Sequence, residues 1–344
     1  MNRLLSRRLA ACACALVAAT AQAAAPPHYD LARVVAPNGA RTQATALGAG
    51  GHVTGIVYSK IDPTQSAGFL WTPTTFHAFS PFGSSTSWGQ SVNAAGDVAG
   101  GLRTTASTTS AYIRLADGTM IAPFRGMGYE SSGGEGINAS RTITGYVVNT
   151  DHVTTDVSWH DGVTTPLQTA GYENNLQLAI NDAGLVGGWV QVGPDPRTVQ
   201  AATWTDGVLQ LLPCLDVQGC QVSGVSSDNR LVGSSAIDDF NSHACLWRDG
   251  RVVDLGTLGQ DWNSSAAGVN ASGDVVGSSS QTAYSASVAT IWRNGRIHDL
   301  SQFVDLPQGW KLLWASAIND AGQILATAGG PDGRAVDVVL TPRQ

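Results

Sequence analysis

One ten-residue pattern recurs seven times along the sequence and constrains the fold more than any other feature. In its clearest copy, GVNASGDVVG at residues 268–277, an apolar pair leads to Asn, a turn ending in Gly, and a β-branched run that closes on another Gly. Asn before a Gly-bearing turn predicts a β-hairpin with the Gly in the left-handed region. The copies lie at residues 46–55, 91–100, 136–145, 179–188, 224–233, 268–277 and 317–326. Intervals of about 44 residues indicate a repeat architecture.

A second hairpin follows the first within each period. Its turn is Asp-Gly or Asn-Gly between apolar strands, the strongest short-range hairpin signal, because both turn residues take positive φ. A Trp precedes this turn in several copies, and we predict that Leu115 takes the Trp position before Asp117-Gly118. Two hairpins supply four short antiparallel strands, the content of one propeller blade. The sequence therefore predicts an all-β, seven-bladed β-propeller.

The two ends of the propeller sequence complement each other. After the last hairpin, RAVDVVLTP at residues 334–342 supplies a third strand, with Leu340 in the place that Trp71 holds in the first repeat. The fourth strand is missing there, but HYDLARV at residues 28–34 carries the Asp-Leu pair found in other fourth strands. We predict that the N-terminal strand closes the last blade, and that residues 26–344 form a single propeller domain.

Residues 1–25 have the pattern of a secretory signal peptide. Arg3, Arg7 and Arg8 precede an apolar stretch that ends in small-x-small cleavage sites. Two refinements stay open: a lipoprotein site at Cys12, and twin-arginine export through the adjacent arginines. No later run is long enough to be a membrane helix. We expect a secreted, periplasmic or cell-surface protein.

Cysteine usage and charge give further constraints. Cys214 and Cys220 enclose a short loop, which predicts a disulfide in an exported chain, with two free thiols as the alternative. Cys245 lies in an apolar strand and is expected to be a small buried side chain. The formal net charge is −7 and the only lysines are Lys60 and Lys311, so we expect no nucleic-acid partner. We also expect a monomer.

The repeat is similar to a known one. HACLWRDGRVVDLGTLGQDWNSSAAGVNASGDVVG, at residues 243–277, resembles the HAF repeat of probable extracellular bacterial proteins. That repeat combines a His-Ala-Phe-Leu-Trp strand, an Asp-Leu-Gly strand and an Ile-Asn-x-x-Gly hairpin. Here Cys245 stands where Phe is usual, and the third strands of other copies diverge to AYIRL, DVSW and QAATW. The resemblance implies an exported repeat protein and no defined activity.

Recognisable catalytic and metal motifs are absent from the sequence. The repeated asparagines are explained as turn caps, and the scattered histidines form no His-x-x-x-His pair. Neither a calcium loop nor a Gly-x-Ser-x-Gly elbow occurs. We expect no metal, no cofactor and no catalytic residue. A hydrolase or lyase acting on carbohydrate, with loop carboxylates at the propeller mouth, is the alternative.

The predicted topology separates two faces of the ring. The two tight turns of each blade share one face, while the second-to-third-strand loops and the blade-to-blade connections share the other. Variable loops on a rigid scaffold are where binding usually occurs. The candidate binding residues there are Trp88, Tyr129, Glu130, Tyr172, Asp238, Asp239, Asp261, Trp262 and Trp310.

Aromatic rings beside carboxylates suit stacking on a sugar or anchoring a protein. We therefore predict a non-catalytic binding scaffold for a glycan or a surface protein. Two alternatives stay open: these aromatic rings pack between blades, or the protein is a structural module without a small ligand. The third-strand tryptophans are expected in the core.

Overall fold

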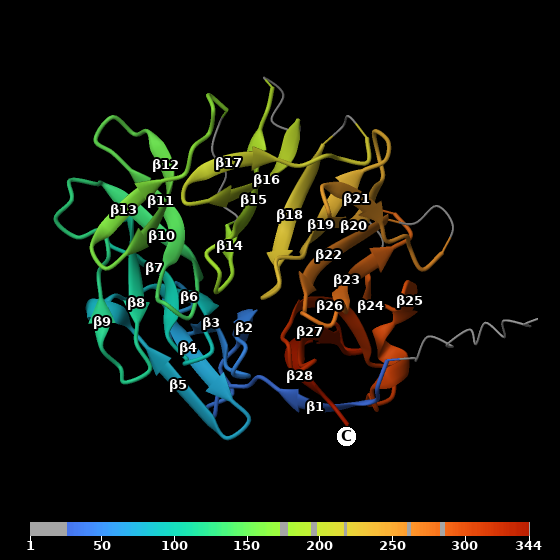
Figure 1. The fold of residues 1–344 in the computed structure, drawn as a ribbon. Coiled ribbons are helices and arrows are strands. Elements are labelled where there is room, and N and C mark those ends of the chain that lie inside the picture. The colour runs from blue at the N-terminus through green and yellow to red at the C-terminus, as the bar shows by residue number, and fades with distance from the viewer. Residues whose placement is uncertain are drawn as a thin grey trace, which may run out of the picture.

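The computed structural model describes residues 26–172, 178–193, 198–216, 219–259, 263–282 and 286–343. Their strands form seven four-stranded antiparallel sheets arranged as the blades of a ring (Figure 1). The predicted seven-bladed β-propeller is confirmed. Within these residues, no helix is long and apolar enough to cross a membrane.

The strands follow the chain in blade order, with the innermost strand first. Blade 1 contains β2 (Thr42–Leu47), β3 (Val53–Tyr58), β4 (Ser66–Thr72) and β5 (Thr75–Phe79). Blade 2 contains β6 (Ser87–Val92), β7 (Val98–Arg103), β8 (Thr109–Arg114) and β9 (Met120–Ile121). Blade 3 contains β10 (Ser131–Ile137), β11 (Ile143–Val148), β12 (Thr154–His160) and β13 (Val163–Pro166). Blade 4 contains β14 (Ala179–Ile180), β15 (Val186–Gln191), β16 (Val199–Thr205) and β17 (Val208–Leu211).

The remaining blades follow the same plan. Blade 5 contains β18 (Cys220–Val225), β19 (Leu231–Ala236), β20 (Ser242–Arg248) and β21 (Arg251–Asp254). Blade 6 contains β22 (Asn263–Val269), β23 (Val275–Ser280), β24 (Val288–Arg293) and β25 (Arg296–Asp299). Blade 7 contains β26 (Lys311–Ile318), β27 (Ile324–Gly329), β28 (Ala335–Pro342) and β1 (Tyr29–Arg33). Two short 3-10 helices, η1 (Pro81–Gly83) and η2 (Leu300–Phe303), lie in blade-to-blade connections.

Blade 7 is completed by both ends of the propeller. Strand β1 pairs antiparallel with β28, in a register that runs from Tyr29 opposite Pro342 to Arg33 opposite Val338 (Figure 1). The Tyr29 side chain is only 2% exposed and packs in the hydrophobic cluster of blade 7 with Leu340. The predicted closure by the N-terminal strand is confirmed.

The tight turns have the predicted chemistry, with one register difference. At Asp161 and Gly162 φ is 44° and 86°, so both turn residues take positive φ, as Asp-Gly allows. In blade 2, however, Val98 pairs with Arg114, whereas Ile143 in blade 3 pairs with Trp159. The prediction that Leu115 takes the Trp position is therefore wrong. The blade 2 turn is one residue longer, which moves Arg114 into that position.

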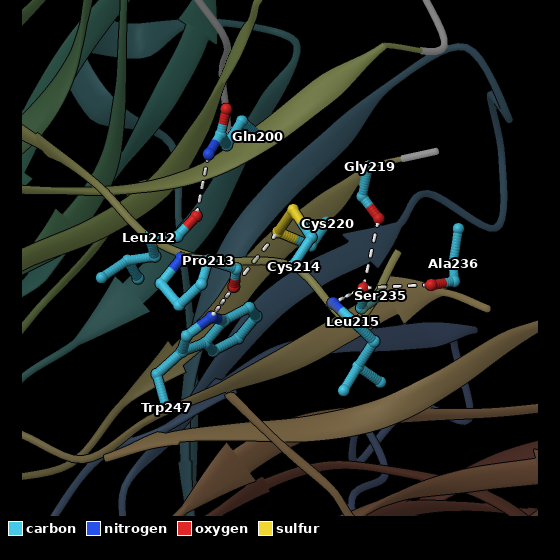
Figure 2. Close-up of a disulfide and its surroundings, with 10 residues drawn as sticks. All are labelled: Gln200, Leu212, Pro213, Cys214, Leu215, Gly219, Cys220, Ser235, Ala236 and Trp247. Atoms are coloured by element: carbon cyan, nitrogen blue, oxygen red, sulfur yellow. Dashed lines mark hydrogen bonds between the residues drawn. A yellow bond between two sulfur atoms is a disulfide. The ribbon is translucent and has the colours of Figure 1, made fainter. Parts of the chain in front are cut away.

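The third-strand tryptophans lie in the core, as predicted, and two of them also link blades. All five are buried: Trp71, Trp159, Trp204, Trp247 and Trp292. The indole nitrogen of Trp204 donates a 2.7 Å hydrogen bond to the carbonyl of Gln168, which follows blade 3. The indole nitrogen of Trp247 likewise donates a 2.7 Å hydrogen bond to the carbonyl of Pro213, which follows blade 4 (Figure 2). Hydrogen bonds from these indole groups therefore join blade 4 to blade 3 and blade 5 to blade 4, in addition to apolar packing.

The connection between blades 4 and 5 carries the disulfide. Cys214 follows β17 and bonds to Cys220 at the start of β18, with an S–S distance of 2.05 Å (Figure 2). Cys245 is fully buried in blade 5, and burial raises the pKa of its thiol far above the ordinary value. Its environment is that of a small core side chain.

The repeated asparagines do more than cap their own turns. Each side-chain oxygen accepts backbone N–H bonds within its hairpin, as at Asn93 from Ala95 and Asp97. Each amide nitrogen donates to a turn carbonyl of the next blade. These bonds run from Asn93 to Asn138 (3.1 Å), Asn138 to Asn181 (3.2 Å), Asn181 to Ser226 (2.8 Å), Asn270 to Asn319 (3.4 Å) and Asn319 to Gly48 (3.2 Å).

Gly48 stands where the other copies carry Asn or Ser, because a Cβ there would lie 2.8 Å from the backbone oxygen of Asn93.

Replacing Asn319 by Ala is expected to lower the free energy of unfolding by about 1–3 kcal/mol, because it removes the cap and leaves the buried Gly48 carbonyl without this donor. Asn149→Ala is the matched control, since Asn149 caps its loop through Asp151 and Val153 on the surface. Its expected cost is below about 1 kcal/mol. Urea unfolding of both variants measures the difference. Equal losses would show that the inter-blade bond adds no stability.

Candidate functional site

Two cavities formed by the described residues lie on opposite faces of the ring. The larger, which we call the channel cavity, has a volume of about 540 Å³ and is lined by the first strands of all seven blades and by several of the turns that follow them. The smaller, the loop-face cavity, has a volume of about 410 Å³ and lies between blades 5 and 6. Its wall consists of Ala236, Asp238, Asp239, Phe240, Asn241, Ser242, Asn263, Ser264, Ser265, Ser278 and Ser280.

Most of the first strands contain a β-bulge, and in each of these strands an inserted residue faces the channel cavity. Register shifts mark such a bulge in blades 1, 2, 3, 5, 6 and 7. One inserted residue from each of these blades lines the cavity: Thr45, Gln90, Glu135, Ser223, Ala267 and Ser316. A bulge turns one side chain away from the alternating pattern of its strand. Equivalent positions in these six blades therefore direct one side chain each into the channel cavity. Glu135 is the only charged residue in this set.

Glu135 has an unusual environment. Its carboxylate is largely buried, and this burial raises its pKa to about 7. The nearby negative charge of Asp156 raises the pKa further, while a 3.2 Å hydrogen bond from the Gln90 amide opposes the shift. A carboxyl group with this pKa changes its charge near neutral pH.

The other two carboxylates of the channel cavity connect blades. Asp182 in blade 4 accepts a 2.8 Å bond from the backbone nitrogen of Ala139 in blade 3. Asp320 in blade 7 accepts from the backbone of Ala271 at 2.8 Å and from the hydroxyl of Ser227 at 2.7 Å. A backbone donor holds Asp182, and a backbone and a hydroxyl donor hold Asp320, so both carboxylates support turns of neighbouring blades. No Lys, Arg or His belongs to the described wall of this cavity.

The loop-face cavity combines polar walls with one exposed ring. Phe240 is 86% exposed at the tip of the loop between β19 and β20. The hydroxyls of Ser265, Ser278 and Ser280 line the cavity and form no hydrogen bond with other described residues. The Asp238 carboxylate accepts bonds from the backbone of Phe240 and Asn241 and from the Asn241 amide, and these bonds lower its pKa. Asp238 therefore shapes the loop.

The structure brings together only part of the predicted site. Asp238 and Asp239 share the loop-face cavity, whereas Asp261 and Trp262 lie outside the described residues. The Glu130 carboxylate lies 3.0 Å from Nδ1 of His152, which belongs to the loop between β11 and β12 of blade 3.

Three of the remaining aromatic candidates, Trp88, Tyr172 and Trp310, are partly buried against neighbouring residues, whereas Tyr129 is exposed. The Trp88 ring covers the backbone of Gly101, its cross-strand partner in blade 2. Trp310 lies against Gly330 and below the Arg33 guanidinium, whose carbon is 5.0 Å from the ring centre. Tyr172 packs against the blade 4 cluster, and Tyr129 meets the Phe124 ring edge-on at 6.3 Å between centres. The Trp88 and Trp310 rings thus pack against glycines, Gly101 and Gly330. Their positions in the sequence did not reveal this packing.

Sequence reasoning missed Glu135, Phe240 and the serine hydroxyls. The signal for Glu135 was available in the repeats, because the residue that immediately precedes each ten-residue copy is the one that lines the channel cavity. Among the described residues, no group of three or more His, Cys, Asp or Glu side chains is placed to hold a metal ion.

Comparison with solved structures shows the propeller fold. The β-propeller domain of the Trilobed protease from Pyrococcus furiosus aligns with a TM-score of 0.57 and 9% identity, over 87% of this chain and 95% of that one. It is described as having an open velcro topology, whereas β1 closes the last blade here. A streptogramin B lyase aligns with a TM-score of 0.53 and 10% identity, over 92% and 98% of the two chains.

A puromycin-hydrolyzing peptidase from Mycobacterium tuberculosis aligns with a TM-score of 0.58 and 10% identity, over 94% of this chain. The chain spans only 56% of the length of that peptidase. At such identities the similarity shows the fold and transfers no activity. The sequence matches no protein-family model and no curated protein.

Proposed function

We propose that the protein is an exported, non-catalytic binding scaffold that holds a glycan in the loop-face cavity. The observation that carries this proposal is the exposed Phe240 ring beside a polar cavity of about 410 Å³. Its volume falls within the range of small-ligand sites in proteins. A cavity on the variable face of a rigid ring is also where the topology favours binding.

The chemistry of the wall suits a sugar. A pyranose ring has an apolar face of C–H groups, which packs on an aromatic ring, and a rim of hydroxyls. Phe240 offers the aromatic ring, and Ser265, Ser278 and Ser280 offer hydroxyls that both donate and accept. Because Asp238 is occupied within its own loop, the proposed contacts are mainly neutral hydrogen bonds and stacking.

Export is supported by independent features of the chain. The basic and apolar pattern of residues 1–25 is that of a signal peptide, and the repeat at residues 243–277 resembles a probable extracellular repeat. The Cys214–Cys220 disulfide persists in an oxidising compartment such as the periplasm or the outside of the cell. We propose one of these destinations.

Replacing Phe240 by Ala is expected to weaken glycan binding by about 10- to 100-fold, as for a central aromatic contact, without changing thermal stability. A glycan array identifies the ligand, and calorimetry with that ligand measures the loss. Ile61→Ala is the matched control, because Ile61 is 97% exposed in the corresponding loop of blade 1. An array without binding, or unchanged affinity in Phe240→Ala, would contradict the proposal.

A further inference from the structure

We propose that the channel cavity is a second ligand site, which binds the ammonium group of a small primary amine between Glu135 and Gln90. This site opens among the Asn turns, on the face opposite the loop-face cavity. It is therefore separate from the proposed glycan site and makes no use of its residues.

The shape of the cavity favours a small molecule. Its volume of about 540 Å³ is within the usual range for small-ligand sites, and seven first strands form its wall. The other bulge positions around the ring carry small neutral side chains: Thr45, Ser223, Ala267 and Ser316. Because the wall consists of paired strands, the site is largely formed before a ligand enters.

The Gln90–Glu135 pair leaves two acceptors for a ligand. The Gln90 amide nitrogen donates to Oε2 of Glu135 at 3.2 Å. Oε1 of Glu135 and Oε1 of Gln90 accept no hydrogen bond from the described residues, although both side chains line the cavity. An ammonium group has three donors and no acceptor, so it fits a carboxylate oxygen beside an amide oxygen.

The charges around the site favour a cation over an anion. The wall carries Glu135, Asp182 and Asp320 and no described cationic side chain, and Asp156 of β12 adds a negative charge behind Glu135. Asp182 and Asp320 are exposed in turns at the rim of the cavity, whereas Glu135 is the carboxylate that is largely buried in its wall. Burial without a cation explains why the pKa of Glu135 is raised to about 7. An ammonium ion would take the place of that proton.

The pH dependence follows from this exchange. An alkylamine stays protonated from pH 6 to 8, as a Lys side chain does. Glu135, with a pKa of about 7, is mostly protonated at pH 6 and mostly ionised at pH 8. Since the ammonium group pairs with the ionised form, the amine should bind about tenfold more tightly at pH 8 than at pH 6.

Carboxyl-carbon NMR tests the proposal directly. The chain has only three glutamates, Glu130, Glu135 and Glu173, so labelling Glu at its carboxyl carbon gives three resonances, and the variant Glu135→Gln assigns the signal of interest. Titration with n-hexylamine is expected to shift the Glu135 resonance toward its ionised position and to lower its pKa below 7. The other two resonances should not respond.

Matched controls separate a specific site from general attraction to a negative protein. Glu135→Gln should weaken hexylamine binding at least tenfold while retaining glycan binding, and Glu130→Gln should leave amine binding unchanged. The neutral isostere n-hexanol should bind at least tenfold more weakly than the amine. A Glu135 resonance unmoved by millimolar hexylamine, equal binding by Glu135→Gln, or equal binding of hexanol would each overturn the proposal.

Discussion

Deleting residues 1–34 is expected to leave a chain that no longer forms a stable ring. The deletion removes β1, whose residues pair along β28, and the side chains of Tyr29 and Val34, both buried. It also removes the 2.8 Å bond from the Val34 nitrogen to the Asp337 carbonyl. Loss of one large core side chain alone costs about 3–5 kcal/mol, so the total approaches the about 5–15 kcal/mol that holds a typical domain folded.

A variant that begins at Pro26 is the control for this deletion. It keeps β1 intact, so we expect its thermal midpoint to match that of the full chain. The longer deletion also exposes β28 as an unpaired edge, which favours aggregation. Circular dichroism and size-exclusion chromatography distinguish the two variants. If the chain without residues 1–34 stays monomeric and melts at the same temperature, closure by β1 does not stabilise the propeller.

Trp204→Ala has the second largest expected effect, a loss of about 3–5 kcal/mol in the free energy of unfolding. The Trp204 side chain is 1% exposed in the core of blade 4, and its indole N–H bonds to the Gln168 carbonyl. Truncation removes the packing and also leaves this carbonyl without its donor. Chemical denaturation measures the loss.

Substitution by Phe separates the hydrogen bond from the packing. Trp204→Phe keeps most of the apolar surface and loses the bond to Gln168. Trp292→Phe is the matched control, because the buried Trp292 indole nitrogen donates no hydrogen bond to the described residues. We expect Trp204→Phe to cost about 1–2 kcal/mol more than Trp292→Phe. Equal costs would mean that the links at Trp204 and Trp247 contribute only through packing.

Much of the fold was predictable because its signals are local. Asp161-Gly162 needs only its own backbone to specify a tight hairpin, and the period of about 44 residues repeats that information in each blade. The strand β1 was recognisable from the Asp-Leu pair at Asp30. The Leu115 prediction failed because one additional turn residue shifts the strand register, and local composition does not report that shift.

The candidate site was less predictable because it depends on contacts between blades. Trp88 and Trp310 resembled exposed ligand-binding rings, but Gly101 and Gly330 leave space for them within the blades. Asp238 and Asp239, predicted as binding residues, line the loop-face cavity, although hydrogen bonds within the loop occupy the Asp238 carboxylate. No sequence pattern indicated that Phe240 stays uncovered.

By itself, the sequence determined the number of blades, the strand order and the closure by β1, since each follows from turn chemistry or periodicity. It favoured the Cys214–Cys220 disulfide over two free thiols, and the structure shows the bond. Only the tertiary structure decided which carboxylates are available to a ligand. Glu135 differs from Asp182 because it is largely buried in the wall of the channel cavity, whereas Asp182 is exposed in a turn, and the spacing along one chain does not encode this difference in burial. The cavities likewise exist only where seven separately specified blades meet around an axis or along a shared face.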